Sequence, residues 1–219
     1  MRVNQYLASS TGLGRRTIDD AIKAGRVRIN NDLAKLGQDV KDSDSVYLDN
    51  ELVNELKIHL TILLNKPVGY VCSRDGQGSP TIYNLLPKQY ANLKYAGRLD
   101  KDSSGLVILT NDGNLLNKLT HPTNSEDKIY QVELNKPLLL KDKLQIETGK
   151  IKLDSKPSIM KIKQNKQSNS KIEVTLREGR NRQIRRTFSK VGYEVVNLHR
   201  TKIGKYSITD LKNDKFIKI

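Results

Sequence analysis

The chain has 219 residues, a formal net charge of +15, a pI of about 9.8, no Trp and only 5% aromatic residues. This charge favours a polyanionic partner, nucleic acid before a membrane surface, and the core must rest on Leu, Ile and Val. The sequence lacks a long apolar run and an apolar N-terminal stretch and has a single Cys, so we expect a cytoplasmic protein without membrane span, signal peptide or internal disulfide.

Charge is unevenly distributed along the chain. Residues 1–30 hold six Lys or Arg against two Asp or Glu, residues 31–58 hold three against seven, and residues 59–219 hold 30 against 15. The acidic, polar stretch DNELVNELK closes the second segment. We therefore expect two domains, a small N-terminal one with its connector (1–58) and a larger one (59–219).

The first thirty residues predict two helices and a strand. A short helix is expected around residues 3–7, and the spacing of Ile18, Ala21 and Ile22 predicts a second one. Gly25 is placed to end that helix, and VRIN then reads as a strand that enters a turn.

Arg15 and Arg16 stand near the start of the second helix, where the helix dipole disfavours cations. A bound phosphate would explain the pair, and the alternative is two solvated arginines on an amphipathic helix. RVNQYLASSTGLGRRTIDDAIKAGRVRIN resembles the RNA-binding domain named after ribosomal protein S-four. Gly14 replaces the family's usual Ser, and Asn30-Asn31 replaces its Asn-Gly turn, but glycine still caps a helix and Asn tolerates the left-handed conformation.

The larger segment predicts more strands than helices. IHLTILLNK predicts a buried strand that breaks at Pro67, and LVILT, KIYQVEL and KIEVTL predict further strands. TIYNLLP and NLLNKLTH predict helices, and KIKQNKQSNSK a strand end with a solvated hairpin loop. Because long crossovers do not alternate regularly with the strands, we expect an α+β fold with a mixed, mainly antiparallel sheet.

The stretch GRLDKDSSGLVILTNDG places Asp100 between Arg98 and Lys101, shortly before an apolar run. Desolvation raises the pKa of a carboxyl group, so a carboxylate that stays ionised beside apolar residues needs cations nearby. Asp100 is therefore either a member of a structural ion pair or a working group. Asp100 and Asp102 do not indicate a glycosidase, because an i, i+2 pair in a loop does not show the spacing of its two carboxylates.

The stretch REGRNRQIRRTFSKVG predicts a turn, a helix cap at Asn181 and an amphipathic helix. The positions expected to face the core are Ile184, Phe188 and Val191. Arg182 and Arg186 then point toward solvent or RNA, and Arg185 lies at the edge of the core, where it can reach into a cleft. The alternative is that these arginines only solvate the helix.

GRLDKDSSGLVILTNDG, with NKPVG, KIYQVEL and EGRNRQIRR, resembles the pseudouridine synthases of the RsuA/RluB/RluE/RluF group. The resemblance extends over nearly the whole chain, to KVGYEVVNLHRTKIG. It implies an isomerase that breaks the N-glycosidic bond of a uridine in ribosomal RNA, turns the base and rejoins it through carbon. It also implies ribosomal RNA or an immature ribosomal subunit as partner, no metal or small-molecule cofactor, no membrane, and a monomer by default.

The resemblance assigns roles to single residues. Asp100 matches the catalytic aspartate, which attacks the ribose or the base or takes a ribose proton. Arg185 matches the arginine that pairs with this aspartate and keeps it ionised. Tyr130 matches the tyrosine that stacks on the target base, although an ordinary strand aromatic is the alternative. Arg98 is expected to open the RNA or fill the gap left by the base, and Leu198 to form an apolar wall.

Other residues receive binding or structural roles. The residues expected to bind RNA besides Arg98 and Leu198 are Arg182, Arg186, Arg15 and Arg16. Those assigned to structure or solvent are Lys66, Pro67, Cys72, Asp102 and Asp112. HPTNSEDKIY and LLPK are more similar to the RluB-type members, which favours a target in large-subunit ribosomal RNA. The alternative function is a non-catalytic ribosome-binding or assembly factor that retains the fold.

Overall fold

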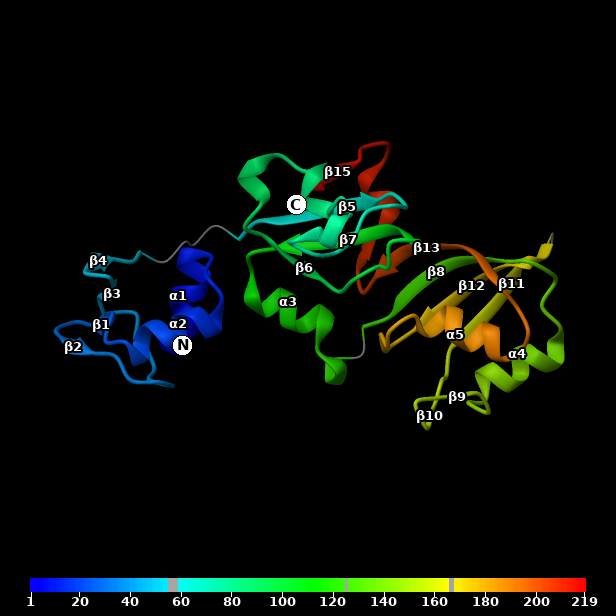
Figure 1. Ribbon diagram of the computed structural model, residues 1–219, viewed down its shortest axis with the longest axis horizontal. Coiled ribbons are helices and arrows are strands. Elements are labelled where there is room, and N and C mark those ends of the chain that lie inside the picture. The colour runs from blue at the N-terminus through cyan, green and yellow to red at the C-terminus, as the bar shows by residue number, and fades with distance from the viewer. Residues whose placement is uncertain (55–58, 125, 166–167) are drawn as a thin grey trace.

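The structure, a computed structural model, describes residues 1–54, 59–124, 126–165 and 168–219 (Figure 1). Residues 1–54 form a small unit at one end of the molecule, and the remaining described residues form a larger one. Each unit buries hydrophobic clusters of its own. Of the predicted connector DNELVNELK, residues 55–57 lie outside the described residues, whereas Glu51–Leu52 form a strand of the small unit. No helix in the described part of the chain is long and apolar enough to cross a membrane.

The small unit packs two helices against a four-stranded antiparallel sheet in the order β2-β1-β3-β4. Its elements are α1 (Val3–Thr11), α2 (Arg15–Lys23), β1 (Val27–Ile29), β2 (Asp32–Leu33), β3 (Val46–Leu48) and β4 (Glu51–Leu52). As predicted, Ile18, Ala21 and Ile22 are buried and Gly14 occupies the cap position of α2. The predicted turn after β1 is also confirmed, because Asn30 takes a left-handed φ of 55°.

The larger unit has many strands and few helices. Its α-helices are α3 (Gly113–Thr120), α4 (Leu140–Glu147) and α5 (Gln183–Lys190). Its strands are β5 (Thr61–Lys66), β6 (Lys94–Ala96), β7 (Ser104–Thr110), β8 (Lys128–Leu134), β9 (Lys152–Leu153), β10 (Lys156–Pro157), β11 (Lys161–Asn165), β12 (Ser168–Leu176), β13 (Val195–Ile203), β14 (Tyr206–Ser207) and β15 (Phe216–Lys218). Short 3₁₀ helices lie at Gly76–Gly78, Ile82–Leu85, Lys88–Tyr90, Pro122–Asn124 and Ile208–Leu211.

One large sheet runs through this unit in the order β11-β12-β8-β13-β7-β5-β15, with β6 and β14 paired at its sides. Neighbouring strands are antiparallel except β13 and β7, which are parallel. Strands and helices are not interleaved as in a parallel α/β sheet. The predicted α+β class with a mixed, mainly antiparallel sheet is therefore confirmed.

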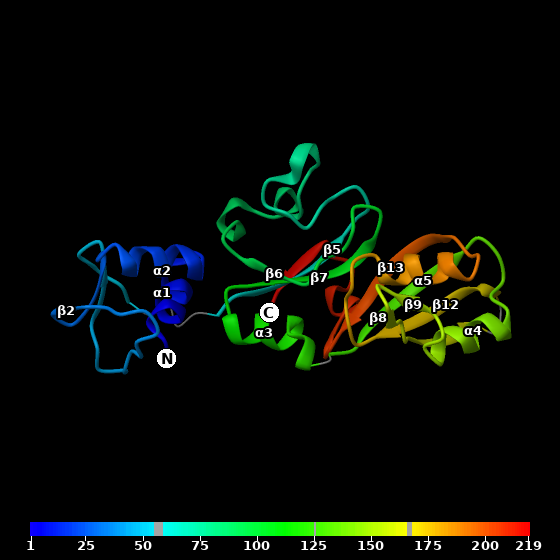
Figure 2. The same ribbon diagram turned by 60° about the horizontal axis from the view of Figure 1, so that its bottom comes forward.

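Strands β5 and β7 are covered on both faces, which explains why their sequences are almost continuously apolar. Leu63, Leu106 and Ile108 cluster with Leu119 of α3, whereas the alternate residues of both strands cluster with Ile82 of a 3₁₀ helix. Figure 2 shows α3 on one side of these strands and the 3₁₀ segment on the other.

The two halves of the sheet meet where β13 passes β7. The parallel pairing is short, with His199 opposite Ser104 and Arg200 opposite Gly105. Gly105 has φ +110°, and a Cβ atom built on it would overlap the Arg200 carbonyl oxygen and lie 2.5 Å from the Arg200 amide nitrogen. Only glycine therefore permits this approach of the two backbones.

Helix α5 differs from the prediction at its first turn. The cap position is Arg182, in a left-handed conformation (φ 46°), and not Asn181. The Gln183 side chain instead accepts a hydrogen bond from the Arg180 backbone N–H at 3.2 Å and so closes the turn before the helix. The core-facing side of the helix is as predicted, since Ile184 and Phe188 are buried.

We predict that Gly105→Ala lowers the free energy of unfolding by about 3 kcal/mol or more, because strain at a positive φ adds to a backbone overlap. Gly192→Ala is the matched control, since Gly192 also has a positive φ but a Cβ atom there meets no atom within 4 Å. The control is expected to lose about 1 kcal/mol. Denaturant unfolding measures both, and equal losses would contradict the steric account.

Candidate active site

A cavity of ≈ 410 Å³ lies in the larger unit, next to the place where β7 and β13 meet. Its walls come from the loop between β6 and β7, from β8 and β13, and from the segment that leads from β12 into α5. The predicted site residues that line it are Arg98, Asp100, Tyr130, Arg182 and Leu198. Segments that are far apart in the sequence therefore converge on one hollow.

Asp100 lies in the loop that feeds β7, and its side chain is 33% exposed. The loop is fixed through its backbone, because the Asp100 carbonyl accepts from Ser103 N–H at 3.1 Å and the Lys101 carbonyl accepts from Gly69 N–H at 2.8 Å. The ion-pair partner of the carboxylate is Arg182, whose Nη1 lies 3.7 Å from Oδ2. This separation leaves the Asp100 oxygens open to the cavity.

Asp102 holds two arginines, Arg182 of the cavity wall and Arg185 behind it. Arg182 binds its carboxylate in a bidentate manner, with Nη1–Oδ1 and Nη2–Oδ2 distances of 3.1 and 2.9 Å. Arg185 places Nε 3.3 Å from Oδ2 and donates from Nη2 to the Asp102 carbonyl at 2.9 Å. Burial would raise the pKa of Asp102, but the hydrogen bond from Arg182 and the charges of both arginines hold that pKa below its ordinary value.

The predicted pairing of Arg185 with Asp100 is therefore wrong. Arg185 sits at the edge of the core as expected, but its Nη1 donates to the Val195 carbonyl at 2.6 Å and its other nitrogens face Asp102. The assignment of Asp102 to structure or solvent agrees with this anchoring role, but the sequence did not indicate which arginines it holds. The excess of arginines around α5, with few local carboxylates, was the signal that a distant acidic residue was required.

Tyr130 and Leu198 form the apolar part of the cavity wall. They lie on the neighbouring strands β8 and β13 and are 8% and 6% exposed. The Arg200 guanidinium carbon lies 6.0 Å from the centroid of the Tyr130 ring. An aromatic face and an aliphatic side chain beside a carboxylate provide a place for one planar base.

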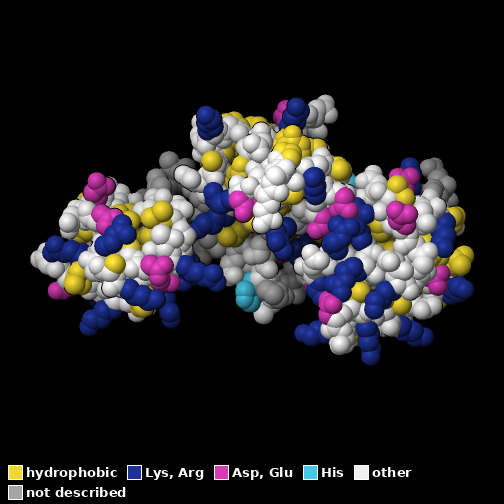
Figure 3. All heavy atoms as spheres, viewed as in Figure 1, with side chains coloured by type: hydrophobic (Ala, Val, Ile, Leu, Met, Phe, Trp, Pro, Cys, Tyr) yellow, Lys and Arg dark blue, Asp and Glu magenta, His cyan; other side chains and the backbone are white. Residues whose placement is uncertain are grey.

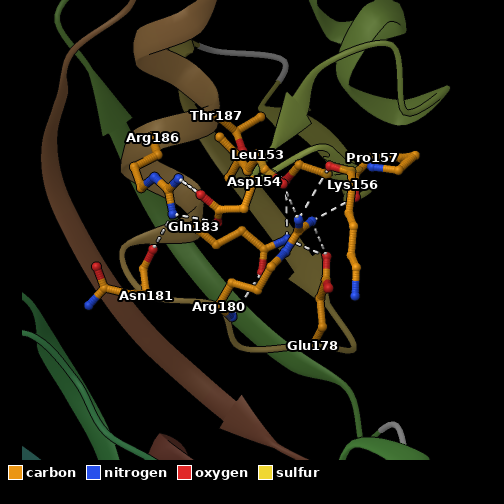
Figure 4. A network of polar contacts seen from close by, with 11 residues as sticks. Leu153, Asp154, Lys156, Pro157, Glu178, Arg180, Asn181, Gln183, Arg186 and Thr187 are labelled. Carbon is orange, nitrogen blue, oxygen red and sulfur yellow. Dashed lines mark hydrogen bonds and ion pairs between the residues drawn. The ribbon is translucent and has the colours of Figure 1, made fainter.

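Arg180, a cavity residue that the sequence analysis did not single out, fixes the segment before α5 (Figure 4). Its Nη1 donates to the carbonyls of Leu153 and Lys156 at 3.0 and 3.3 Å. Its Nη2 donates to the Pro157 carbonyl at 2.6 Å and lies 2.8 Å from Glu178 Oε1. This side chain ties the β9–β10 hairpin to the cavity wall.

Four of the predicted site residues lie outside the cavity lining, namely Arg185, which Asp102 holds as described above, and Arg186, Arg15 and Arg16. Arg186 binds Asp154 in a bidentate manner, with distances of 3.0 and 2.6 Å, on the hairpin side of α5 (Figure 4). Arg15 and Arg16 belong to the small unit, where Arg15 Nη2 donates to the Asn4 side-chain oxygen at 3.2 Å. These residues are not brought together with Asp100.

The residues assigned to structure are held by backbone contacts. Lys66 is fully buried and donates from Nζ to the carbonyls of Pro67 and Tyr70 at 3.0 and 2.8 Å. Burial lowers the pKa of Lys66, against the charges of Cys72, Asp100 and Asp102. Asp112 caps α3, as its assignment to structure predicted. In the part of the chain that the structure describes, no three His, Cys, Asp or Glu side chains are grouped to hold a metal ion.

Comparison with known proteins identifies the family. The family model described as RNA pseudouridylate synthase matches residues 60–190, more than half of the chain. The chain belongs to the RNA pseudouridylate synthase family. The resemblance to the RsuA/RluF pseudouridine synthases and the prediction of an enzyme are thereby confirmed.

Full-length relatives agree with this assignment. The chain is 34% identical over 206 residues to the ribosomal small subunit pseudouridine synthase A of Haemophilus influenzae, which covers 93% of this chain and 89% of the relative. It is 34% identical over 227 residues to the dual-specificity RNA pseudouridine synthase RluF of Escherichia coli. That alignment covers 99% of this chain and 77% of the relative. A crystal structure of a pseudouridylate synthase superposes on this chain with a TM-score of 0.71 at 32% sequence identity. The superposition covers 100% of this chain and 96% of the solved one.

We predict that Asp102→Asn lowers the rate of pseudouridine formation by about 100-fold, because loss of the anchor displaces the arginine wall from Asp100. Asp154→Asn is the matched control, since it also breaks a bidentate arginine pair but outside the cavity. Its rate is expected to stay close to wild type. Single-turnover rates measure both, and equal losses would show that Asp102 does not act on the site.

Proposed function

We propose that the protein isomerises a uridine of ribosomal RNA to pseudouridine, with Asp100 as the catalytic carboxylate. The observation that carries this proposal is the cavity in which Asp100, Tyr130 and Leu198 meet in a chain of the pseudouridylate synthase family. The relatives named as a ribosomal small subunit synthase and as a dual-specificity RNA synthase support ribosomal RNA as the substrate class.

The cavity supports a specific division of roles. Its volume of ≈ 410 Å³ suits one extruded nucleotide. The Tyr130 ring stacks on the base, Leu198 closes the apolar side, and Asp100 acts on the reacting nucleotide. Arg98 is exposed beside the cavity and fills the gap that the base leaves in the RNA. Arg182 and Arg185, fixed by Asp102, keep the wall positively charged beside Asp100.

The basic surface supports RNA as the partner. Lys150, Lys152, Lys156 and Lys190 are exposed around the β9–β10 hairpin and the end of α5. Figure 3 shows Lys and Arg side chains gathered over this part of the larger unit. Arg186 adds to this surface. We assign the phosphate contacts of the larger unit to these residues, since cations near one another attract a nucleic-acid backbone.

We also propose that residues 1–58 form an RNA-binding domain like that of ribosomal protein S-four and residues 59–219 the catalytic domain. Arg15 and Arg16 begin α2, where an incoming phosphate is the natural counterion. The protein acts in the cytoplasm as a monomer, on ribosomal RNA or an immature subunit. We assign it no metal or small-molecule cofactor, because the isomerisation consumes no reductant or nucleotide.

Tritium release from uracil C5 tests the reaction directly, since a new carbon bond at C5 displaces the tritium. Wild-type protein is expected to release tritium from a transcript of one ribosomal subunit RNA, or from the corresponding immature subunit. Asp100→Asn is expected to release none. An active Asp100→Asn variant would contradict the assignment of the catalytic carboxylate.

The same assay separates the enzyme from the alternative. A non-catalytic assembly factor with this fold would bind the RNA or the particle but release no tritium from either subunit RNA or from immature subunits. That combination of binding without release would overturn the proposed function.

We predict that Arg15→Ala with Arg16→Ala weakens RNA binding and reduces the slope of log affinity against log salt by about 0.7–0.9 for each lost phosphate contact. Lys35→Ala, an exposed change in the same unit, is the matched control. Filter binding over a salt series measures the slopes. A slope that is unchanged in the double variant would mean that the pair contacts no phosphate.

A further inference from the structure

Arg200 is a buried arginine in the cavity wall that the sequence analysis did not single out. It lies on β13, opposite Gly105 in the short parallel pairing with β7, and is 1% exposed. Its Nε donates to the Leu106 carbonyl at 2.8 Å, and its Nη1 donates to the Arg98 carbonyl at 3.3 Å. Its Nη2 is buried and has no hydrogen-bond partner among the described residues.

The charge of Arg200 also lacks a counterion within the described residues. The acidic groups of the site are taken by other cations, since Asp102 binds Arg182 and Arg185 and Asp100 faces Arg182. A guanidinium stays charged in a protein, and an unpaired buried ion costs several kcal/mol. The fold therefore keeps a positive charge and a free donor at a position where a ligand can supply the acceptor.

The place of this charge indicates which ligand it meets. The guanidinium carbon lies 6.0 Å from the centroid of the Tyr130 ring, and both residues line the cavity with Asp100. A base stacked on Tyr130 is thus a neighbour of Arg200. The acceptors of uracil are its two carbonyl oxygens, which suit an N–H donor.

We propose that Arg200 donates from Nη2 to a carbonyl oxygen of the target uracil and stabilises the base as an anion after it leaves the ribose. This inference rests on the proposed function. When the C1′–N1 bond breaks, its electron pair stays on the base, and the negative charge spreads over N1 and the carbonyl oxygens. C5 then supplies the electron pair for the new C1′–C5 bond, and the proton lost from C5 is balanced by the proton gained at N1.

A fixed cation in a cavity of low dielectric suits this task, because it is oriented before the charge develops. Arg182 and Arg185 are less suited, since each already binds Asp102. Lys128 lines the same wall. Burial lowers the pKa of Lys128, and the positive charge of Arg200 lowers it further, so the charge of Arg200 is felt by a second residue of the cavity.

A purely structural role is the alternative, because Arg200 also holds the backbone of Arg98, two residues before Asp100. The two roles differ in one respect. A structural defect slows every substrate by the same factor, whereas loss of a bond to a carbonyl oxygen changes the response to substitution of that oxygen.

The test measures single-turnover rates on RNA with uridine, 2-thiouridine or 4-thiouridine at the target position. Sulfur accepts hydrogen bonds weakly, so each analogue perturbs one carbonyl. Arg200→Lys is expected to slow the uridine reaction by about 100- to 1,000-fold. For one of the two analogues, we expect the thio-to-uridine rate ratio to differ between wild type and variant by about fivefold or more.

Controls separate the possible failures. Lys202→Met removes an exposed positive charge from the same strand and is expected to keep the wild-type ratios. Equal ratios in wild type and Arg200→Lys for both analogues would overturn the proposal. Loss of a cooperative melting transition in both Arg200→Lys and Arg200→Gln would assign Arg200 to the fold and overturn it as well. If the wild-type protein converts no uridine, the proposed function is contradicted, and this inference, which rests on it, is contradicted as well.

Discussion

The approach of β13 to β7 at Gly105 is the constraint on which the site depends. Because Gly105 has no side chain, the Arg200 backbone passes against it, and the guanidinium reaches forward to the Leu106 and Arg98 carbonyls. A hydrogen bond of 2.8 Å between Ser104 Oγ and His199 Nδ1 adds a side-chain contact to the same pairing of β7 and β13. The loop that carries Asp100 is thus held from behind by one strand, while its front faces the cavity.

The two carboxylates of this loop, Asp100 and Asp102, make different ionic contacts. Asp102 is saturated by two arginines and gives the wall its shape. Asp100 has one ion-pair contact, at 3.7 Å. A carboxylate with every lone pair engaged is a poor reactant, whereas one with a longer contact stays charged and open. Asp102 is therefore a structural acid, and the open carboxylate beside it, Asp100, is the one that we propose as the working acid.

Local patterns predicted the local structure well. Apolar spacing gave the core side of α5 and the helices of the small unit, and the motifs with their family resemblance gave Asp100, Tyr130 and Leu198 as cavity residues. Contacts between distant segments were not predictable in this way. Arg185 meets Asp102 rather than Asp100 because the conformation of the loop before β7, and not the sequence pattern, sets which carboxylate faces α5. Arg200 was missed because a polar residue in an alternating strand usually faces solvent, and only the crossing at Gly105 buries it.

The most direct test of the account is the structure of the Asp100→Asn protein bound to RNA that contains the target uridine. We predict that the uridine lies extruded in the cavity, with its base on the Tyr130 ring, its ribose C1′ facing residue 100 and one uracil carbonyl within hydrogen-bond distance of Arg200 Nη2. A bound RNA whose target base stays outside the cavity, or enters it without approaching Arg200, would contradict the account.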